Sequence, residues 1–238
     1  MTADAVATVT LSRPERRNAL DVETCRTLTS QLRRASDDGA RAIVVAGDGP
    51  HFCAGADLDA VHDPDFALAL RQLLDAIVQI PVPVIAAVHG AALGAGMQLA
   101  VACDLRVVDP TARFGIPAAK LGLMVDHWTV RRVAQLAGHG PARAMLLAAE
   151  ELDAEAALRL GLGQRAGGLP AAQAWAAEIA ALAPLTIAGH KLALNRLDGE
   201  PPSDGEVDAA RRRAWSSQDL AEGVAAFRDR RPPTFRGR

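Results

Sequence analysis

Three short windows of this sequence place small residues and glycines where a protein backbone could do chemistry. The windows are residues 51–58 (HFCAGADL), residues 85–104 (IAAVHGAALGAGMQLAVACD), and residues 114–117 (FGIP) with 121–123 (LGL) beyond them. In the second window an apolar strand ends in a glycine-rich turn and a helix follows. The first N–H groups of a helix lack partners inside the helix, and its N-terminus is partially positive. Small residues let a ligand approach such a backbone closely, which favours an anion or a developing oxyanion.

Two other interpretations of these windows compete with that one. Glycines between a strand and a helix often serve tight packing alone, and this alternative stays open for either of the first two windows taken singly. The run GAALGAG at 90–96 also looks like a nucleotide-binding loop. It matches neither GxGxxG nor GxxxxGK[ST], and no lysine follows it, so a phosphate site of that kind is disfavoured.

The elements that would position these windows alternate between strands and helices in the first half of the chain. Strands are expected near 5–11, 41–46, 84–88 and 105–108, and helices near 21–35, 66–80 and 97–103, with a turn at 90–96. From about residue 117 the pattern is mostly helical, near 129–136, 142–149, 154–160, 171–182, 185–197 and 205–227 with a break. The strand–helix rhythm predicts an α/β class with an at least partly parallel sheet.

Composition narrows the class of partner. The 238 residues are 50% hydrophobic and carry a formal net charge of −2, which gives no electrostatic case for nucleic acid or an anionic membrane. No apolar run approaches the ~18 residues of a membrane span, and the N-terminus lacks a signal pattern, so we expect a cytoplasmic protein. The three cysteines show no CxxC pair and the histidines no ligand spacing. We therefore expect buried free thiols and no metal site.

Taken together and in order, the three windows resemble the enoyl-CoA hydratase/isomerase family of the crotonase superfamily. The similarity extends to SRP…RNAL at 12–20 and to AF…RRP…F at 226–235. It implies a crotonase (ClpP/crotonase-like) fold, which is a spiral of ββα units with a C-terminal helical region. It also implies a core over residues 1–182 and a helical trimerisation region over 183–238, in a homotrimer or a hexamer that is a dimer of trimers.

The resemblance implies an acyl-CoA ligand and no other cofactor. Its thioester carbonyl would lie between the backbone N–H groups of Ala56 and Ala95, an oxyanion hole that stabilises enolate charge. The positions that match the coenzyme A site of the family are Ala54, Gly55, Ala56, Asp57, Leu58, Arg17 and Ala19.

The sequence departs from the family at the two glutamates that hydratases use. Gln98 stands at the first of these positions and Ala118 at the second. An amide exchanges no protons near neutral pH and alanine has no polar group, so hydration of a 2-enoyl-CoA should be very slow. Gln98 lies one helical turn past Ala95 and should face the same pocket. It either bonds a water or the acyl chain, or is satisfied by a neighbouring backbone group.

Asp126 is the remaining candidate acid or base, since some isomerases of the superfamily have a catalytic aspartate at this position. It could equally cap the helix at 129–136, because aspartate is a preferred N-cap, and both roles are compatible. The sequence therefore predicts an acyl-CoA thioester-binding protein of fatty-acid metabolism. The alternatives are a slow enoyl-CoA hydratase, an enoyl-CoA isomerase using Asp126, or a scaffold without a ligand, which the density of motifs disfavours.

Overall fold

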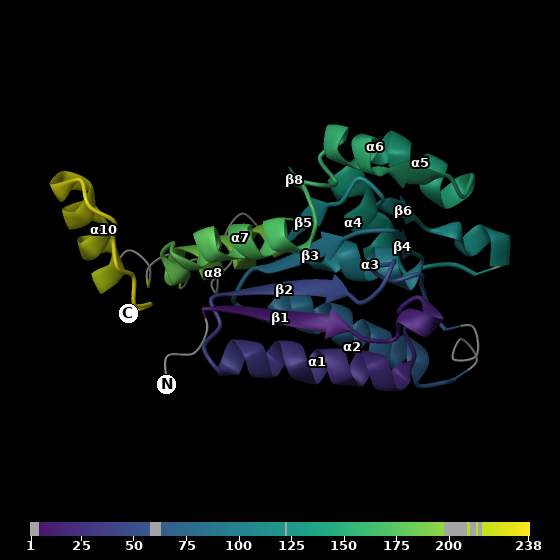
Figure 1. Cartoon of the computed structure of the whole chain (residues 1–238), viewed down its shortest axis with the longest axis horizontal. Coiled ribbons are helices and arrows are strands. Elements are labelled where there is room, and N and C mark those ends of the chain that lie inside the picture. The colour runs from purple at the N-terminus through teal and green to yellow at the C-terminus, as the bar shows by residue number, and fades with distance from the viewer. Residues whose placement is uncertain (1–4, 58–62, 122, 198–208, 210–212, 214–215) are drawn as a thin grey trace.

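The main sheet of the protein is parallel throughout. The computed structural model describes residues 5–57, 63–121, 123–197, 209, 213 and 216–238. The sheet has the order β1-β2-β3-β5-β8, and every neighbouring pair is parallel. Its strands are β1 (Val6–Leu11), β2 (Ala42–Gly47), β3 (Val84–Val88), β5 (Leu105–Val108) and β8 (Arg165–Ala166). Because spatial order follows chain order, each crossover advances the chain in the same direction, as in a spiral (Figure 1).

A second, smaller sheet accompanies the first. It contains β4 (Ala91–Leu93), β6 (Arg113–Gly115) and β7 (Glu151–Asp153). β4 pairs with β6 in parallel, and β6 pairs with β7 in antiparallel fashion. The turn expected at 90–96 is in part a strand, because three of those residues form β4. A strand of three residues is too short for alternating apolar and polar residues to be recognised in the sequence.

Helices cover both faces of the main sheet. In Figure 1, α1 (Val22–Asp37) and α2 (Phe66–Gln79) lie along one face, and α7 (Leu169–Ala180) lies on the other. The other helices are α3 (Ala95–Ala102), α4 (His127–Ala137), α5 (His139–Leu147), α6 (Ala154–Arg159), α8 (Pro184–Asn195) and α10 (Gln218–Asp229), with 3-10 turns η1 (Pro14–Arg16) and η2 (Pro117–Leu121). The predicted α/β class is confirmed, and α3 begins two residues earlier than predicted.

Strand β2 shows why the sheet needs cover on both faces. Its side chains alternate between two hydrophobic clusters, as the period of a strand dictates. Ile43 and Val45 join the cluster under α1, α2 and α3, whereas Val44 joins the cluster under α7. All three are fully or almost fully buried. A strand apolar on both faces is typical of a parallel sheet between helical layers.

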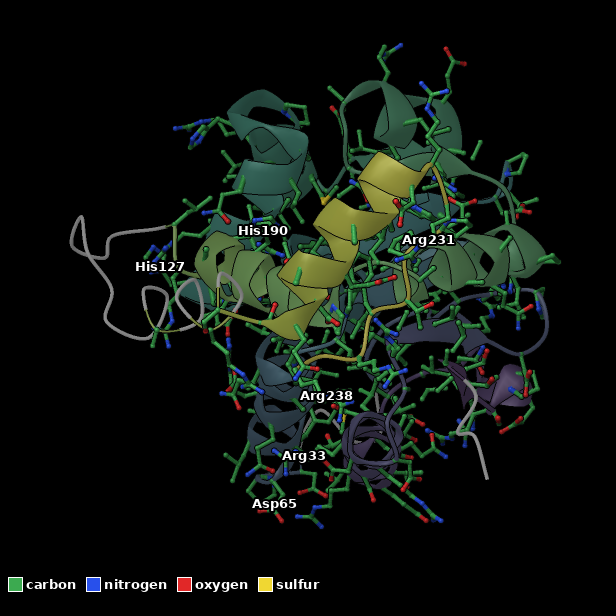
Figure 2. The ribbon with its side chains drawn as sticks, turned by 90° about the vertical axis from the view of Figure 1, so that its left-hand side faces the viewer. Arg33, Asp65, His127, His190, Arg231 and Arg238 are labelled. Carbon is green, nitrogen blue, oxygen red and sulfur yellow. The ribbon has the colours of Figure 1, made fainter. Side chains whose placement is uncertain are left out.

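The two C-terminal helices are attached to the body differently. Lys191 of α8 is buried and pairs with Asp104 at 2.8 Å, and it donates to the carbonyls of Ile77 and Val82. Helix α10 stands away from the sheets (Figure 1). Its hydrogen bonds run to the chain end, which folds back along it between Arg231 and Arg238 (Figure 2).

Three further expectations concern membrane, metal and thiols. Within the described residues, no single helix is long and apolar enough to cross a bilayer, and only the bent pair α7 and α8, at 112°, passes when combined. That same part of the chain contains no group of three or more His, Cys, Asp or Glu side chains placed to hold a metal ion. All three cysteines are free and buried, as predicted, and burial raises the pKa of each thiol to about 12.

Candidate functional site

The fold brings the three glycine-rich windows of the sequence together. Cys53 forms a parallel bridge with Ala92, the central residue of β4. The Cys53 N–H donates to Ala91 at 2.9 Å, and the Leu93 N–H donates to Cys53 at 3.1 Å. The N–H of Gly94 then donates to the carbonyl of Gly115 in the third window at 2.9 Å. Windows that lie about 40 and 20 residues apart in the chain therefore meet at the N-terminus of α3.

Glycines allow this close approach. A Cβ atom at Gly96 would lie 2.0 Å from the carbonyl oxygen of Cys53, which no side chain tolerates. Gly55 has φ +128°, and a Cβ there would lie 3.2 Å from the carbonyl oxygen of Leu93. Gly94, the N-cap of α3, has φ 53° and ψ −117°, a conformation open to glycine alone. The tight-packing interpretation of these glycines is thus correct, and it sets the positions of the surrounding N–H groups.

Ala56 and Ala95 occupy matching places in the two windows. Ala56 lies three residues beyond Cys53, and Ala95 lies three residues beyond Ala92, which is bridged to Cys53. Ala95 is the first residue of α3, where an N–H has no acceptor inside the helix. Among the described residues, the structure records no acceptor for the N–H of Ala56 or of Ala95. This part of the structure therefore leaves two main-chain donors without a recorded acceptor, each shortly after the bridge between the two windows.

The predicted coenzyme A positions also lie side by side. The N–H of Ala54 donates to the carbonyl of Arg17 at 3.0 Å, and Leu20 exchanges hydrogen bonds with Gly55 and Asp57. Residues 17–20, including Ala19, therefore run along residues 54–57. Leu58, the last predicted position of this group, lies outside the described residues.

Two side chains whose roles are not predictable from the sequence hold this segment in place. Asn18 is buried, and its amide donates to the carbonyls of Asp48 and His51 while accepting from the N–H of Arg13. Arg13 in turn pairs with Asp57 at 3.1 Å and donates to the carbonyl of Ala19 at 2.8 Å. The positive φ of Asn18, 57°, was the kind of feature that only coordinates reveal.

Gln98 and Asp126 are joined through one intervening residue. The Nε2 of Gln98 donates to the Oγ1 of Thr129 at 2.7 Å, and that hydroxyl donates to the Oδ1 of Asp126 at 2.5 Å. Arg71 of α2 donates to the Oδ2 of Asp126 at 3.2 Å and stacks over the ring of Trp128 at 4.8 Å. The amide nitrogen of Gln98 therefore bonds a side chain and not the neighbouring backbone considered from sequence.

Asp126 is the N-cap of α4, which is one of the two roles expected for it from the sequence. Its Oδ1 accepts the N–H of Thr129 at 2.9 Å. Burial alone would raise the pKa of Asp126, but the hydrogen bonds from Thr129 and Arg71 outweigh it and hold the pKa below its ordinary value. A carboxylate this well paired is a weak base. Ala118 lies in η2, half-buried against the main core, and brings no polar side chain.

Buried charges anchor the far end of α3. Asp104 accepts the N–H of Val84 and pairs with Lys191, so its role is structural. Arg106 is 1% exposed, and burial lowers its pKa to about 10. Its guanidinium donates to the carbonyls of Ala100, Cys103, Asp104 and Leu162. Arg106 thus fixes the C-terminus of α3, the helix whose N-terminus forms the candidate site. No pattern in the sequence predicted this role.

The parallel spiral and the converging glycine windows define the class of fold, and the comparisons identify the family. The family model for enoyl-CoA hydratase/isomerase matches residues 1–238. The chain belongs to this family.

Several known proteins are similar over nearly their whole length. The protein named "Probable enoyl-CoA hydratase echA6" of Mycobacterium bovis is 49% identical over 99% of this chain and 97% of its own. The crystal structure of an enoyl-CoA hydratase/carnithine racemase from Magnetospirillum magneticum matches with a TM-score of 0.89 at 34% identity, covering 98% of this chain and 93% of that one. An enoyl-CoA hydratase from Polaromonas sp. JS666 also matches with a TM-score of 0.89 at 30% identity, covering 99% and 98%.

Proposed function

We propose that this protein binds the thioester of an acyl-CoA between the N–H groups of Ala56 and Ala95 and does not hydrate it at an appreciable rate. The observation that carries the proposal is the pair of main-chain donors that follow the bridge between Cys53 and Ala92, neither of which has an acceptor among the described residues. A polarised thioester places negative charge on one oxygen, and two preorganised donors stabilise that charge.

The lack of a carboxylate at two positions argues for binding over turnover. Gln98 donates to Thr129 and Ala118 has no polar group. A positioned acid or base is worth roughly 10²–10⁴ in rate, so loss of both leaves a polarised but unreactive thioester. The function that fits is sequestration or delivery of acyl-CoA in fatty-acid metabolism, in the cytoplasm.

Binding itself is tested by titration calorimetry with saturated acyl-CoAs of several lengths. Micromolar binding with one thioester per chain is the expected result. Absence of binding up to millimolar ligand would remove the proposal.

The role of the Ala95 N–H is tested by Ala95→Pro. Proline is well tolerated at the first position of a helix; it deletes the N–H there and places its Cδ where that hydrogen was. The lost hydrogen bond of about 0.5–1.5 kcal/mol should by itself raise the Kd of an acyl-CoA roughly two- to twelvefold, and contact of the ring with the thioester oxygen adds to that loss. Ala154→Pro is the matched control, since Ala154 also begins a helix, α6, and the two alanines are 6% and 8% exposed. Equal effects of the two variants would assign the loss to proline and not to the donor.

A slow enoyl-CoA hydratase is the second candidate, because the names of the similar proteins favour it. An isomerase using Asp126 is a variant of this candidate. Both are tested by incubating 2- and 3-enoyl-CoAs with the wild type and with Asp126→Asn. Turnover that survives this substitution would exclude Asp126 as the base.

We also propose that residues 183–238 carry a trimerisation surface. The way α10 stands clear of the sheets (Figure 1) supports this proposal, because a helix that projects from one chain is available to a second copy. Light scattering should give the mass of three or six chains, and a monomer over the working range of concentration would refute it.

A further inference from the structure

The direction of the Ala56 N–H follows from the way its segment is paired. Leu20 forms a parallel bridge with Ala56. The N–H of Leu20 donates to the carbonyl of Gly55 at 2.8 Å, and the N–H of Asp57 donates to the carbonyl of Leu20 at 2.7 Å. In a parallel pair only alternate residues bond the neighbouring segment, because successive N–H groups of an extended chain point to opposite sides. The N–H of Ala56 therefore points away from Leu20, and a shift of this bridge would redirect it.

One guanidinium spans the bridge. The Nη1 of Arg13 lies 2.7 Å from the Oδ2 of Asp21 and donates to the carbonyl of Ala19 at 2.8 Å. The Nη2 of Arg13 lies 3.1 Å from the Oδ2 of Asp57. These contacts fall on the residues directly before and after Leu20 and on the residue directly after Ala56. A planar guanidinium presents its donors in a fixed fork, so it can hold the two segments at one spacing.

The charges on the two segments make that spacing depend on Arg13. The carboxylates of Asp21 and Asp57 lie close enough together to share one cation. Asp57 is only 9% exposed, and a charge so poorly reached by water interacts strongly with its neighbours. Asp21 is held in place, because its other oxygen caps α1 by accepting the N–H of Thr24 at 2.7 Å. Without Arg13 the two carboxylates would repel each other and push the bridged segments apart.

We propose that Arg13 is a positioning residue for thioester binding, which aims the N–H of Ala56 at the thioester oxygen by holding Asp21 and Asp57 across the bridge between Leu20 and Ala56. Arg13 acts through the bridge and not by contact with the thioester. The inference rests on the proposed acyl-CoA binding, and it adds the side chain that sets the direction of one of the two donors.

The thioester carbonyl itself reports on the donor. Hydrogen bonds to a carbonyl oxygen lower its stretching frequency, which infrared difference spectra measure for a bound acyl-CoA with an isotope label at the thioester carbon. Arg13→Met should move the stretch to higher frequency at saturating ligand. Titration calorimetry should show the Kd of the acyl-CoA raised roughly two- to twelvefold, the range that one hydrogen bond gives. The Kd of free coenzyme A, which has no thioester, should change by less.

A merely structural role of Arg13 would lower the Tm and leave the carbonyl stretch of the bound ligand where it is in the wild type. An unchanged stretch in Arg13→Met therefore overturns the inference. Equal losses of affinity for acyl-CoA and free coenzyme A also overturn it, because they would assign Arg13 to the coenzyme A part of the ligand. Failure of the wild type to bind acyl-CoA would instead overturn the proposed function, so the two failures are distinguishable.

A second substitution tests the repulsion between the carboxylates. Asparagine caps helices as well as aspartate does, so Asp21→Asn keeps the cap of α1 and removes one of the two charges. Arg13→Met combined with Asp21→Asn should therefore regain part of the affinity and part of the frequency shift, and no recovery overturns the inference. Should Arg13→Met alone fail to fold, the double variant must still show a stretch above that of the wild type for the inference to stand.

Arg165→Met is the matched control. Arg165 pairs with Glu178 at 2.9 Å, between β8 and α7, so this variant also loses one ion pair of an arginine. It should leave the carbonyl stretch, and the ratio of the Kd for acyl-CoA to the Kd for free coenzyme A, at their wild-type values. A shift of the stretch equal to that of Arg13→Met would show that the effect does not belong to the bridge and would overturn the inference.

Discussion

Gly96→Ala should damage the protein even though alanine is the better helix former. Gly96 is the second residue of α3, where a Cβ atom would lie 2.0 Å from the carbonyl oxygen, 2.8 Å from the carbonyl carbon and 2.9 Å from the Cβ of Cys53. Ordinary carbon–oxygen contacts are about 3.3 Å or longer. The start of α3 and residues 53–56 must therefore separate by roughly 1 Å, since backbone atoms on both sides leave no flexible group to yield.

The expected cost follows from this displacement. Overpacking of this kind lowers the free energy of unfolding by about 1–3 kcal/mol, against a gain of about 0.5–1 kcal/mol from replacing a helical glycine. In a chain of this size, each kcal/mol lost shifts the Tm down by about 2–4 °C. The separation also moves Ala95 relative to Ala56. Misplacement of a functional group by 1 Å can cost about 10²-fold in activity. The Kd for acyl-CoA should therefore rise by more than the loss of folding stability alone would cause.

Gly140→Ala is the matched control. Gly140 is likewise the second residue of a helix, α5, and nothing lies within 4 Å of a Cβ built there. This variant should raise the Tm slightly and leave acyl-CoA binding unchanged. Thermal unfolding and calorimetric titration at one protein concentration measure both quantities. If the two substitutions stabilise the protein equally, and Gly96→Ala binds acyl-CoA as the wild type does, the steric argument and the placement of the site at this junction are both refuted.

Three further predictions concern charges and thiols. Asp104→Ala should lower the free energy of unfolding by about 3–5 kcal/mol, because it leaves Lys191 buried without its charge partner. The double variant Asp104→Ala with Lys191→Met should regain part of that stability. Chemical denaturation measures the free energy of unfolding of both variants. The three buried thiols should resist a thiol reagent at pH 8 until the protein unfolds, and fast labelling of the native protein would contradict this. Because burial raises their pKa to about 12, the thiols favour the folded state at pH values below the ordinary thiol pKa. This contribution to stability falls as the pH rises from the ordinary thiol pKa toward 12. Because Asp126 has a lowered pKa, its contribution to stability should be present above about pH 4 and disappear as the pH falls further. The Tm difference between wild type and Asp126→Asn should therefore shrink in acid. A Tm difference that stays constant down to pH 3 would argue against the pairing of Asp126 with Thr129 and Arg71.

The amino-acid sequence alone determined the α/β class and the long elements, and it indicated the candidate residues of the site. β1, α1, β2, α2 and β3 were predictable because each combines a clear hydrophobic period with a capping or breaking residue at its ends, as with Asp21 before α1. The glycine windows were recognisable because a backbone that approaches another backbone closely leaves few residue types to choose from.

The tertiary structure decided the short strands and the partners of the polar side chains. β4 and β8 have three and two residues, too few for periodicity, and they form only because another strand lies beside them. Arg71 and Asp126 lie 55 positions apart, and Gln98 and Thr129 lie 31 apart. Local sequence cannot tell a cap from a base, or which way an amide points, because both depend on the neighbours that folding supplies. The positions of the candidate donors could be predicted from the sequence. Whether their N–H groups have internal acceptors depends on how three distant segments meet at the N-terminus of α3, which only the tertiary structure shows.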